Sequence, residues 1–213
     1  RYTLDDVTTL RLSAGTAYRT ATVFSEYTPL LASWRDIVVP QPLQPERAVN
    51  YGVNLVRHYD LAGMQGTVTM DAYRTEFRDQ VIADFDVRED AVVIKNLSER
   101  STSNHFMLES TAQLPWGVSL RASYMLTDAI EYRGGESKPP PFVSRHRALG
   151  VVTADLFESS LSATVSAEWK GPQNLPDTKA WPAEFRLPER SPAFALLNAH
   201  LNANLGRIDL YVG

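Results

Sequence analysis

The sequence predicts an all-β protein whose antiparallel strands form an up-and-down meander, as one part of a large transmembrane β-barrel. Apolar and polar residues alternate along many segments, which is the mark of strands with two different faces. Most of these segments have roughly 10 residues or more, which suits a tilted strand crossing a membrane. Short connections between them alternate with long ones, as in outer-membrane barrels.

The alternation is clearest from Leu161 to Lys170, where Leu, Ala, Val, Ala and Trp occupy one face and Ser, Thr, Ser, Glu and Lys the other. The segment from Ala195 to Leu205 alternates in the same way. Segment 143–155 is ambiguous, because Leu149 and Val152 fall on opposite faces. A strand with one apolar and one polar face fits a barrel wall between lipid and a polar interior.

About nine such strands are expected, and their lengths favour a membrane barrel, because soluble strands usually have about five or six residues and membrane strands about 9–11. Their approximate ranges are 8–18, 47–60, 65–78, 102–114, 117–131, 143–155, 160–170, 192–205 and 206 onward.

The connections are sorted by length along the chain. Residues 60–64, 114–117, 156–160 and the region of Gly206 are tight, and residues 19–46, 79–101, 132–142 and 171–191 are long. In a meander every second connection lies at the same end, so all tight turns should lie on one rim and all long loops on the other. Aromatic residues near predicted strand ends fit a membrane-interface girdle, although they are common in any β protein. These residues are Tyr51, Tyr59, Trp116, Tyr124 and Trp169.

Composition excludes several classes of protein. The 213 residues carry a formal net charge of −4, which does not suit a nucleic-acid partner, and there is no cysteine for a disulfide scaffold or a thiolate metal site. The longest apolar runs are only a few residues, as in Ala91–Ile94, so no transmembrane helix is predicted. The chain shows no initiator Met, no signal peptide and no domain boundary, and residues 1–213 are interpreted as a piece of one longer barrel domain.

No catalytic motif is present, so no enzyme activity, cofactor or metal site is expected. The histidines are scattered, although His105 and His200 share the polar faces of their strands and could meet in the lumen. Charges on the predicted polar face would line a channel or contact a plug, or else form the solvated face of a soluble sheet. They are Arg11, Asp71, Arg121, Glu168, Arg207 and Asp209.

The long loops hold the candidate ligand-binding residues, because connections of this length are usually functional or disordered. Aromatic and arginine side chains there could grip a bulky ligand, or could equally pack the loops against one another. The candidates are Phe24, Glu26, Tyr27, Trp34 and Arg35 in loop 19–46, and Trp181 and Arg186 in loop 171–191.

Several segments, in a fixed order, resemble the TonB-dependent outer-membrane receptors. The most specific is Leu43-Gln44-Pro45-Glu46 with Asn50–Leu55, which resembles the family's Leu-Lys-Pro-Glu…Asn-Tyr-Glu-x-Gly segment. The others are Gly15–Arg19 with Val23–Glu26, Asp71–Phe77 with Gln80–Ile82, Leu120–Tyr124 with Asp128-Ala129, and Pro141–His146. Together they cover nearly the whole chain.

The sequence departs from the family pattern in three places. Asn104–Glu109 lacks the family's glycine, the final aromatic strand is absent, and so are the N-terminal plug and the TonB box. The resemblance implies a barrel of about 22 strands filled by a plug. About nine strands cannot close that barrel, so this piece should be an open curved sheet with two unpaired edges.

The resemblance also implies a function. It implies a receptor in the bacterial outer membrane that takes up a bulky extracellular ligand, such as a ferric siderophore, a similar metal complex or a vitamin. The implied partners are TonB, reached through the missing N-terminal region, the extracellular ligand and outer-membrane lipid. A passive porin-like channel and, less favoured, a soluble all-β binding module remain open from the strand pattern alone.

Overall fold

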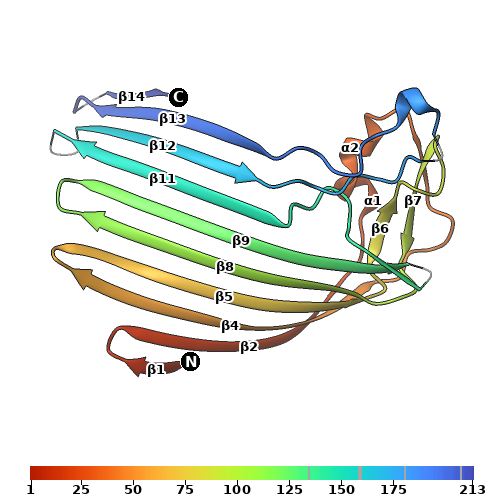
Figure 1. The fold of residues 1–213 in the computed structure, drawn as a ribbon, viewed down its shortest axis with the longest axis horizontal. Helices are drawn as coiled ribbons and strands as arrows, with labels where there is room; N and C mark the ends of the chain where they lie inside the picture. The colour runs from red at the N-terminus through yellow and green to blue at the C-terminus, as the bar shows by residue number, and fades with distance from the viewer. Residues whose placement is uncertain (134, 158–159, 180, 207) are drawn as a thin grey trace.

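One antiparallel sheet of 11 strands runs through most of the described chain (Figure 1). The structure is a computed structural model that describes residues 1–133, 135–157, 160–179, 181–206 and 208–213, without the side chains of Phe24 and Arg133. The strands of this main sheet are β1 (Tyr2–Asp5), β2 (Thr8–Arg19), β4 (Glu46–Leu61), β5 (Met64–Arg78), β8 (Ser101–Leu114), β9 (Val118–Arg133), β10 (Glu136–Lys138), β11 (His146–Leu156), β12 (Leu161–Lys170), β13 (Phe194–Asn204) and β14 (Asp209–Val212).

The predicted meander is confirmed. The strands pair in the order β1-β2-β4-β5-β8-β9-β11-β12-β13-β14, and the short β10 pairs with β9 at its far end. Within the described residues β1 pairs only with β2 and β14 only with β13, so the sheet is open as expected. The sequence pattern missed β1 and β10, because four and three residues are too few to show a period of two.

The register gives the main sheet one apolar face and one polar face. Directly paired residues share a face, and Val152 lies between Leu120 and Val165, whereas Leu149 lies between Ser123 and Glu168. This pairing settles the ambiguity of segment 143–155, because Leu149 belongs to the polar face. The apolar face includes Leu10, Leu12, Val53, Leu55, Met70, Phe106, Leu108, Leu120, Val152, Val165 and Leu201.

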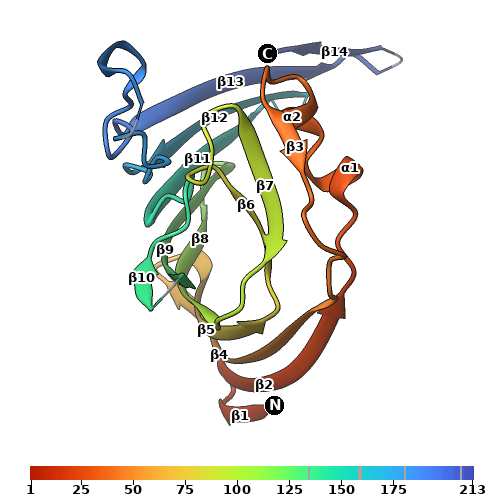
Figure 2. The ribbon, with the colours of Figure 1, turned by 90° about the vertical axis from the view of Figure 1, so that its right-hand side faces the viewer.

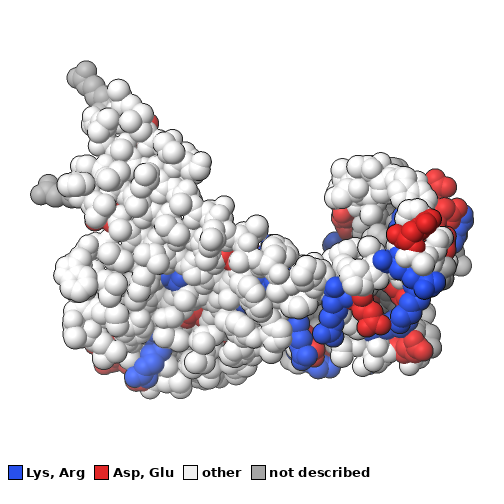
Figure 3. Space-filling view, turned by 45° about the horizontal axis from the view of Figure 1, so that its top comes forward, with Lys and Arg blue, Asp and Glu red and all other residues white. Residues whose placement is uncertain are grey.

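The polar face lies on the inside of the curve. Figure 2 shows the main sheet curving around two short strands, β6 and β7. Glu46, which pairs with Arg19 and lies on the polar face, accepts a 2.6 Å hydrogen bond from the Val81 N–H of β6. Figure 3 shows few charged side chains over the long strands and many where the long loops gather.

The connections sort by length as predicted. The tight turns, including Ala62-Gly63 with its positive φ angles, lie at one end, which we call the turn end (Figure 1). The described residues of 20–45, 79–100, 135–145 and 171–193 lie at the other end, the loop end (Figure 1). The loops contain the short helices α1 (Val23–Glu26), α2 (Thr28–Leu31) and η1 (Ala183–Phe185). None of the described helices is long and apolar enough to cross a membrane.

A second, three-stranded sheet stands at the loop end, where the sequence pattern predicted only loops. In this small sheet β7 (Ala91–Asn96) is central, pairing in parallel with β3 (Asp36–Val38) and antiparallel with β6 (Val81–Asp84). The sequence pattern marked 19–46 and 79–101 only as long connections and missed the three strands within them. The physical reason is burial on both faces, which gives β7 a continuous apolar run in place of an alternating pattern.

Hydrogen bonds anchor the small sheet to the ends of the long strands. The Glu46 carboxylate forms a 2.7 Å ion pair with Arg19, in addition to its bond with Val81. The Asn96 side chain accepts from the Gln44 N–H at 2.8 Å and donates to the Gln44 carbonyl at 2.9 Å. The small sheet is thus held at the loop end by both connections that contribute its strands.

Candidate ligand-binding site

Five side chains from all four long loops meet at the loop end. The guanidinium of Arg35 lies 4.6 Å from the ring centre of Trp181 and 5.9 Å from those of Trp34 and Phe85. Phe85 packs edge-on against Phe142, with ring centres 5.7 Å apart and an interplanar angle of 85°. We call these five residues the aromatic cluster. A guanidinium beside aromatic faces is an attractive cation–π arrangement.

The small sheet positions two members of the cluster. Arg35 directly precedes β3, whose first residue, Asp36, donates its N–H to the Asp90 carbonyl at 2.8 Å. Phe85 directly follows β6, whose last residue, Asp84, is buried and forms a 2.8 Å ion pair with Lys95. Both side chains therefore start from backbone that is fixed by strand pairing.

Trp181 is positioned by the turn around Thr178, a buried residue of loop 171–193. The Thr178 carbonyl accepts from the Trp181 N–H at 3.0 Å, and its hydroxyl accepts from the Leu187 N–H at 2.8 Å. The neighbouring Asp177 N–H donates to the Asp86 carboxylate at 2.9 Å, which joins this loop to the β6–β7 connection.

Phe142 belongs to the third loop, which is bonded to the fourth. Its N–H donates to the Asn174 carbonyl at 2.8 Å. Nearby, the fully buried Ser144 hydroxyl donates to the Gly171 carbonyl at 2.6 Å. The third and fourth loops therefore form one bonded unit on which Phe142 and Trp181 stand.

The side chains of the aromatic cluster differ in burial. Arg35, Phe85 and Trp181 are half-buried among the loops. Trp34 is 75% exposed and Phe142 is 50% exposed. The inner three residues hold the loops together, and the outer two present ring surface to the solvent.

The structure brings together some of the predicted binding residues but not all. Trp34, Arg35 and Trp181 lie in the aromatic cluster, and Arg186 lies beside it, donating from Nε to the Trp181 carbonyl at 2.9 Å. The side chain of Phe24 lies outside the described part of the structure.

Glu26 and Tyr27 instead serve the base of the first loop. Glu26 forms a 3.0 Å ion pair with Arg19, and the Tyr27 hydroxyl donates to the Val81 carbonyl at 3.4 Å. Burial raises the pKa of the Tyr27 phenol, and the nearby carboxylates of Glu26 and Glu46 add to the effect. The phenol is therefore protonated at neutral pH and remains a hydrogen-bond donor.

Sequence reasoning missed Phe85 and Phe142. Both are aromatic residues in long connections, the criterion that selected Trp34 and Trp181, and applying it to residues 79–101 and 132–142 would have found them. What the sequence could not show is that the two rings touch, because they lie 57 positions apart.

A hollow of about 240 Å³ lies next to the cluster, between the third and fourth loops. Its wall carries both charge signs, with Lys138 and Lys179 on one hand and Asp86, Asp177 and Glu189 on the other. Sites that enclose a small molecule usually measure about 300–1,000 Å³. These loops alone therefore do not enclose a bulky ligand.

The polar face holds paired groups and no metal cluster in the described residues. No group of three or more His, Asp or Glu side chains there could hold a metal ion. His105 forms a hydrogen bond with Thr127, and the His200 ring lies tilted beside that of Tyr211 with ring centres 6.0 Å apart, so the two histidines, separated by β9, β11 and β12, do not meet.

Charges of the polar face pair with neighbours on adjacent strands. Arg121 forms a 2.7 Å ion pair with Glu109, and Asp71 accepts a 2.7 Å bond from Asn54. Of the predicted lumen charges, Arg207 lies outside the described residues. The polar face is therefore a network of charged and polar side chains, as the interior of a water-filled or plugged barrel requires.

Comparison with known proteins identifies this architecture. The family model described as TonB dependent receptor-like, beta-barrel matches residues 1–213. No curated protein matches the sequence.

Solved structures of this family share the fold at low sequence identity. The copper transporter OprC has a TM-score of 0.65 and 16% identity, covering 98% of this chain and 31% of its own. The ferric yersiniabactin uptake receptor FyuA from Yersinia pestis has a TM-score of 0.64 and 16% identity, covering 99% of this chain and 30% of its own. The FrpB iron transporter from Neisseria meningitidis has a TM-score of 0.64 and 10% identity, and the match covers 96% of this chain and 31% of the transporter. The chain thus spans less than a third of each of these proteins.

Proposed function

Because the chain belongs to the TonB-dependent receptor-like β-barrel family, we propose that it is part of an outer-membrane receptor that takes up a bulky extracellular ligand with energy from the TonB complex. The observation that carries this proposal is the aromatic cluster, in which all four long loops meet around Arg35. Loops that merely connected strands would have no reason to be fixed by a separate buried sheet.

The chemistry of the cluster favours an anionic ligand with flat or ring-bearing groups. Trp34 and Phe142 offer exposed rings for stacking, and Arg35 and Arg186 supply positive charge beside them. Solved structures with the same fold include a copper transporter, a ferric yersiniabactin uptake receptor and a ferric enterobactin receptor bound to enterobactin. We propose a ferric siderophore or a similar metal complex as the ligand class, with a vitamin as the alternative.

The rest of the barrel and the plug complete the site in this proposal. The main sheet has two open edges, at β1 and β14, and the chain spans less than a third of the solved receptors. An open edge leaves backbone groups without partners, which a closed barrel would pair. Contact with TonB is assigned to the receptor's N-terminal region, and the polar face is assigned to the plug side.

The location that we propose is the bacterial outer membrane. The apolar face would contact lipid, the tight turns would face the periplasm and the loop end the outside. The long strands, up to 16 residues in β4, exceed the length needed to cross the apolar layer, so their loop ends would extend beyond it.

Uptake by cells that produce the full-length protein tests this function. Radioactive iron would be supplied as the ferric complexes of the siderophores that the native host secretes under iron limitation. Uptake that disappears in TonB-deficient cells is expected. Iron uptake that continues unchanged without TonB would instead favour a passive channel. Uptake at background level in both strains would indicate that the ligand is not a ferric siderophore.

A pair of tryptophan variants tests the role of the aromatic cluster in the full-length receptor. Trp34→Ala is expected to weaken ligand binding about tenfold, the effect of losing one stacking ring. Trp116→Ala is the matched control, because Trp116 is equally exposed but lies in a tight turn at the other end. Equal binding by the two variants would remove Trp34 from the site.

A further inference from the structure

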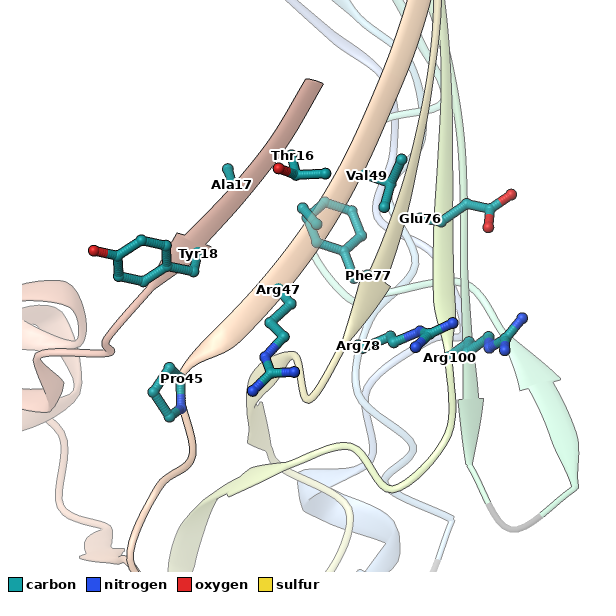
Figure 4. A pocket seen from close by; sticks show the side chains of 11 residues that line it. Thr16, Ala17, Tyr18, Pro45, Arg47, Val49, Glu76, Phe77, Arg78 and Arg100 are labelled. Carbon is teal, nitrogen blue, oxygen red and sulfur yellow. The ribbon is translucent and has the colours of Figure 1, made fainter. Parts of the chain in front are cut away.

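Three arginines stand side by side on the outside of the main sheet, at the loop end. Arg47, the second residue of β4, lies opposite Arg78, the last residue of β5, and Arg100 directly precedes β8 (Figure 4). All three are exposed, and no ion pair between described residues involves any of them. We call them the arginine rim.

The arginine rim belongs to the apolar face, not to the polar interior. Alternate residues of a strand share a face, so Arg47 shares its face with Val49, Tyr51 and Val53. A charged side chain on a lipid-facing surface is costly unless it lies at the interface with water. At the loop ends of the strands, the three guanidinium groups would stand just outside the apolar layer.

Below the arginine rim, a hydrogen-bonded polar patch separates it from the apolar surface. The Tyr51 hydroxyl donates to the Glu76 carboxylate at 2.8 Å, and Arg74 Nε donates to the same oxygen at 3.2 Å. Arg74 also donates to the Asn104 side chain at 3.3 Å. Glu76 is therefore neutralised mainly by Arg74, with a weaker attraction from Arg100, and the arginine rim has no other acidic residue in the lining of its hollow.

Two hollows follow one another along this surface. The upper one measures about 620 Å³ and is lined by the arginine rim with Thr16, Tyr18 and Val49 (Figure 4). The lower one measures about 460 Å³ and is lined on the same face by Val53, Ala72, Phe106 and Leu126, and at the level of the polar patch by Tyr51, Arg74, Asn104 and Asp128. The surface thus passes from a cationic hollow to an apolar one within a few residues of each strand.

We propose that this surface binds a phosphorylated glycolipid of the outer leaflet, with its phosphate on the arginine rim and an acyl chain along the lower hollow. The guanidinium fork matches phosphate oxygens and forms short, charge-assisted hydrogen bonds with them. A free phosphate ion would have no use for the adjoining apolar hollow. The proposal rests on the outer-membrane location proposed above.

Lipid retention by the full-length receptor tests the proposal. The receptor would be placed in phosphatidylcholine nanodiscs with a small fraction of phosphorylated lipid A, and bound glycolipid would be counted by native mass spectrometry. Replacing the rim as R47Q/R78Q/R100Q is expected to lower the apparent affinity about tenfold or more, since each arginine near a phosphate contributes several-fold. The matched control is R57Q/R88Q/R190Q, which removes three arginines elsewhere.

Equal glycolipid retention by the two triple variants would overturn the proposal. A second measurement needs no variant: the wild-type receptor should prefer phosphorylated lipid A to the dephosphorylated form, and equal binding of both would also overturn it. Millimolar inorganic phosphate should not displace the lipid, and complete displacement would show that a free anion suffices. Failure of TonB-dependent uptake would refute the transport function but leave these binding results unaffected.

Discussion

Val92 in the small sheet and Val165 in the main sheet are both valines in the middle of strands, yet Val92 is 0% exposed and Val165 is 53% exposed. The buried apolar residues described in the structure belong almost entirely to the small sheet and its connections: Val81, Ile82, Ala91, Val92, Val93, Ile94 and Leu97. In the main sheet only Ala112 joins them.

The difference shows that the two sheets of this chain suit different surroundings. The small sheet excludes water from a conventional core, so its stability comes from burial of apolar surface. The main sheet satisfies its backbone by pairing with neighbours and leaves its apolar side chains outside, where lipid would cover them. Substitutions in the two regions should therefore respond to different environments, and the following experiments use the full-length protein.

The largest effect is expected for Val92→Asp. An unpaired carboxylate in the core of the small sheet should destabilise that sheet by about 3–5 kcal/mol and release the loops that it holds. Hydrogen exchange should show lost protection in β7 and retained protection in β8. Val87→Asp, at an exposed position of the same connection, is the control, and parallel loss of protection in both sheets would mean that they unfold as one unit.

The next effect separates the two faces of the main sheet. Leu108→Arg places a charge on the apolar face and should cost about 2–4 kcal/mol near the middle of a bilayer. Met107→Arg, one residue away, faces Asp71 on the polar face and should cost much less. Urea unfolding in lipid vesicles measures both, and equal losses would contradict the assignment of the faces.

A smaller effect is expected where the two sheets join. Glu46→Gln removes the charge that pairs with Arg19 and weakens the bond to the Val81 N–H, at a cost of about 1.5–3 kcal/mol. Faster hydrogen exchange of the Val81 amide should report this loss. Glu89→Gln, at an exposed position of the β6–β7 connection, is the control and should leave the exchange rate of the Val81 amide unchanged. An unchanged rate in Glu46→Gln would show that Glu46 does not join the two sheets.

The smallest effect is expected within the aromatic cluster. Arg35→Ala removes the cation between Trp34, Phe85 and Trp181 and should weaken loop packing by about 1 kcal/mol. Limited proteolysis should then cut loop 171–193 several times faster. Arg88→Ala is the control, because Arg88 pairs only locally with Asp90, and identical cleavage of the two variants would show that Arg35 does not hold the loops.

The alternation of apolar and polar residues allowed the long strands to be located from the sequence, because the two faces of a strand show in its own residue order. The segments around Leu161–Lys170 and Ala195–Leu205 appear as β12 and β13 with the predicted faces. For segment 143–155 the local pattern was insufficient, and only pairing with β9 and β12 showed which face Leu149 takes.

The candidate site was only partly predictable. The long loops with aromatic and arginine residues pointed to Trp34, Arg35, Trp181 and Arg186, but loop 19–46 also gave Glu26 and Tyr27 as candidates, and these support the base of the first loop. Whether a loop side chain joins a cluster depends on which other loops reach it, and no local pattern carries that information.

The sequence by itself determined the positions of the long strands, their two faces and the separation of short turns from long loops, because period and length are local properties of the chain. Only the tertiary structure decided that Ala91–Asn96 forms the centre of a second sheet, since its parallel partner, Asp36–Val38, lies more than 50 residues earlier. The same holds for the aromatic cluster and the arginine rim. Their members come from separate loops or strands and meet only when the long strands pair in register.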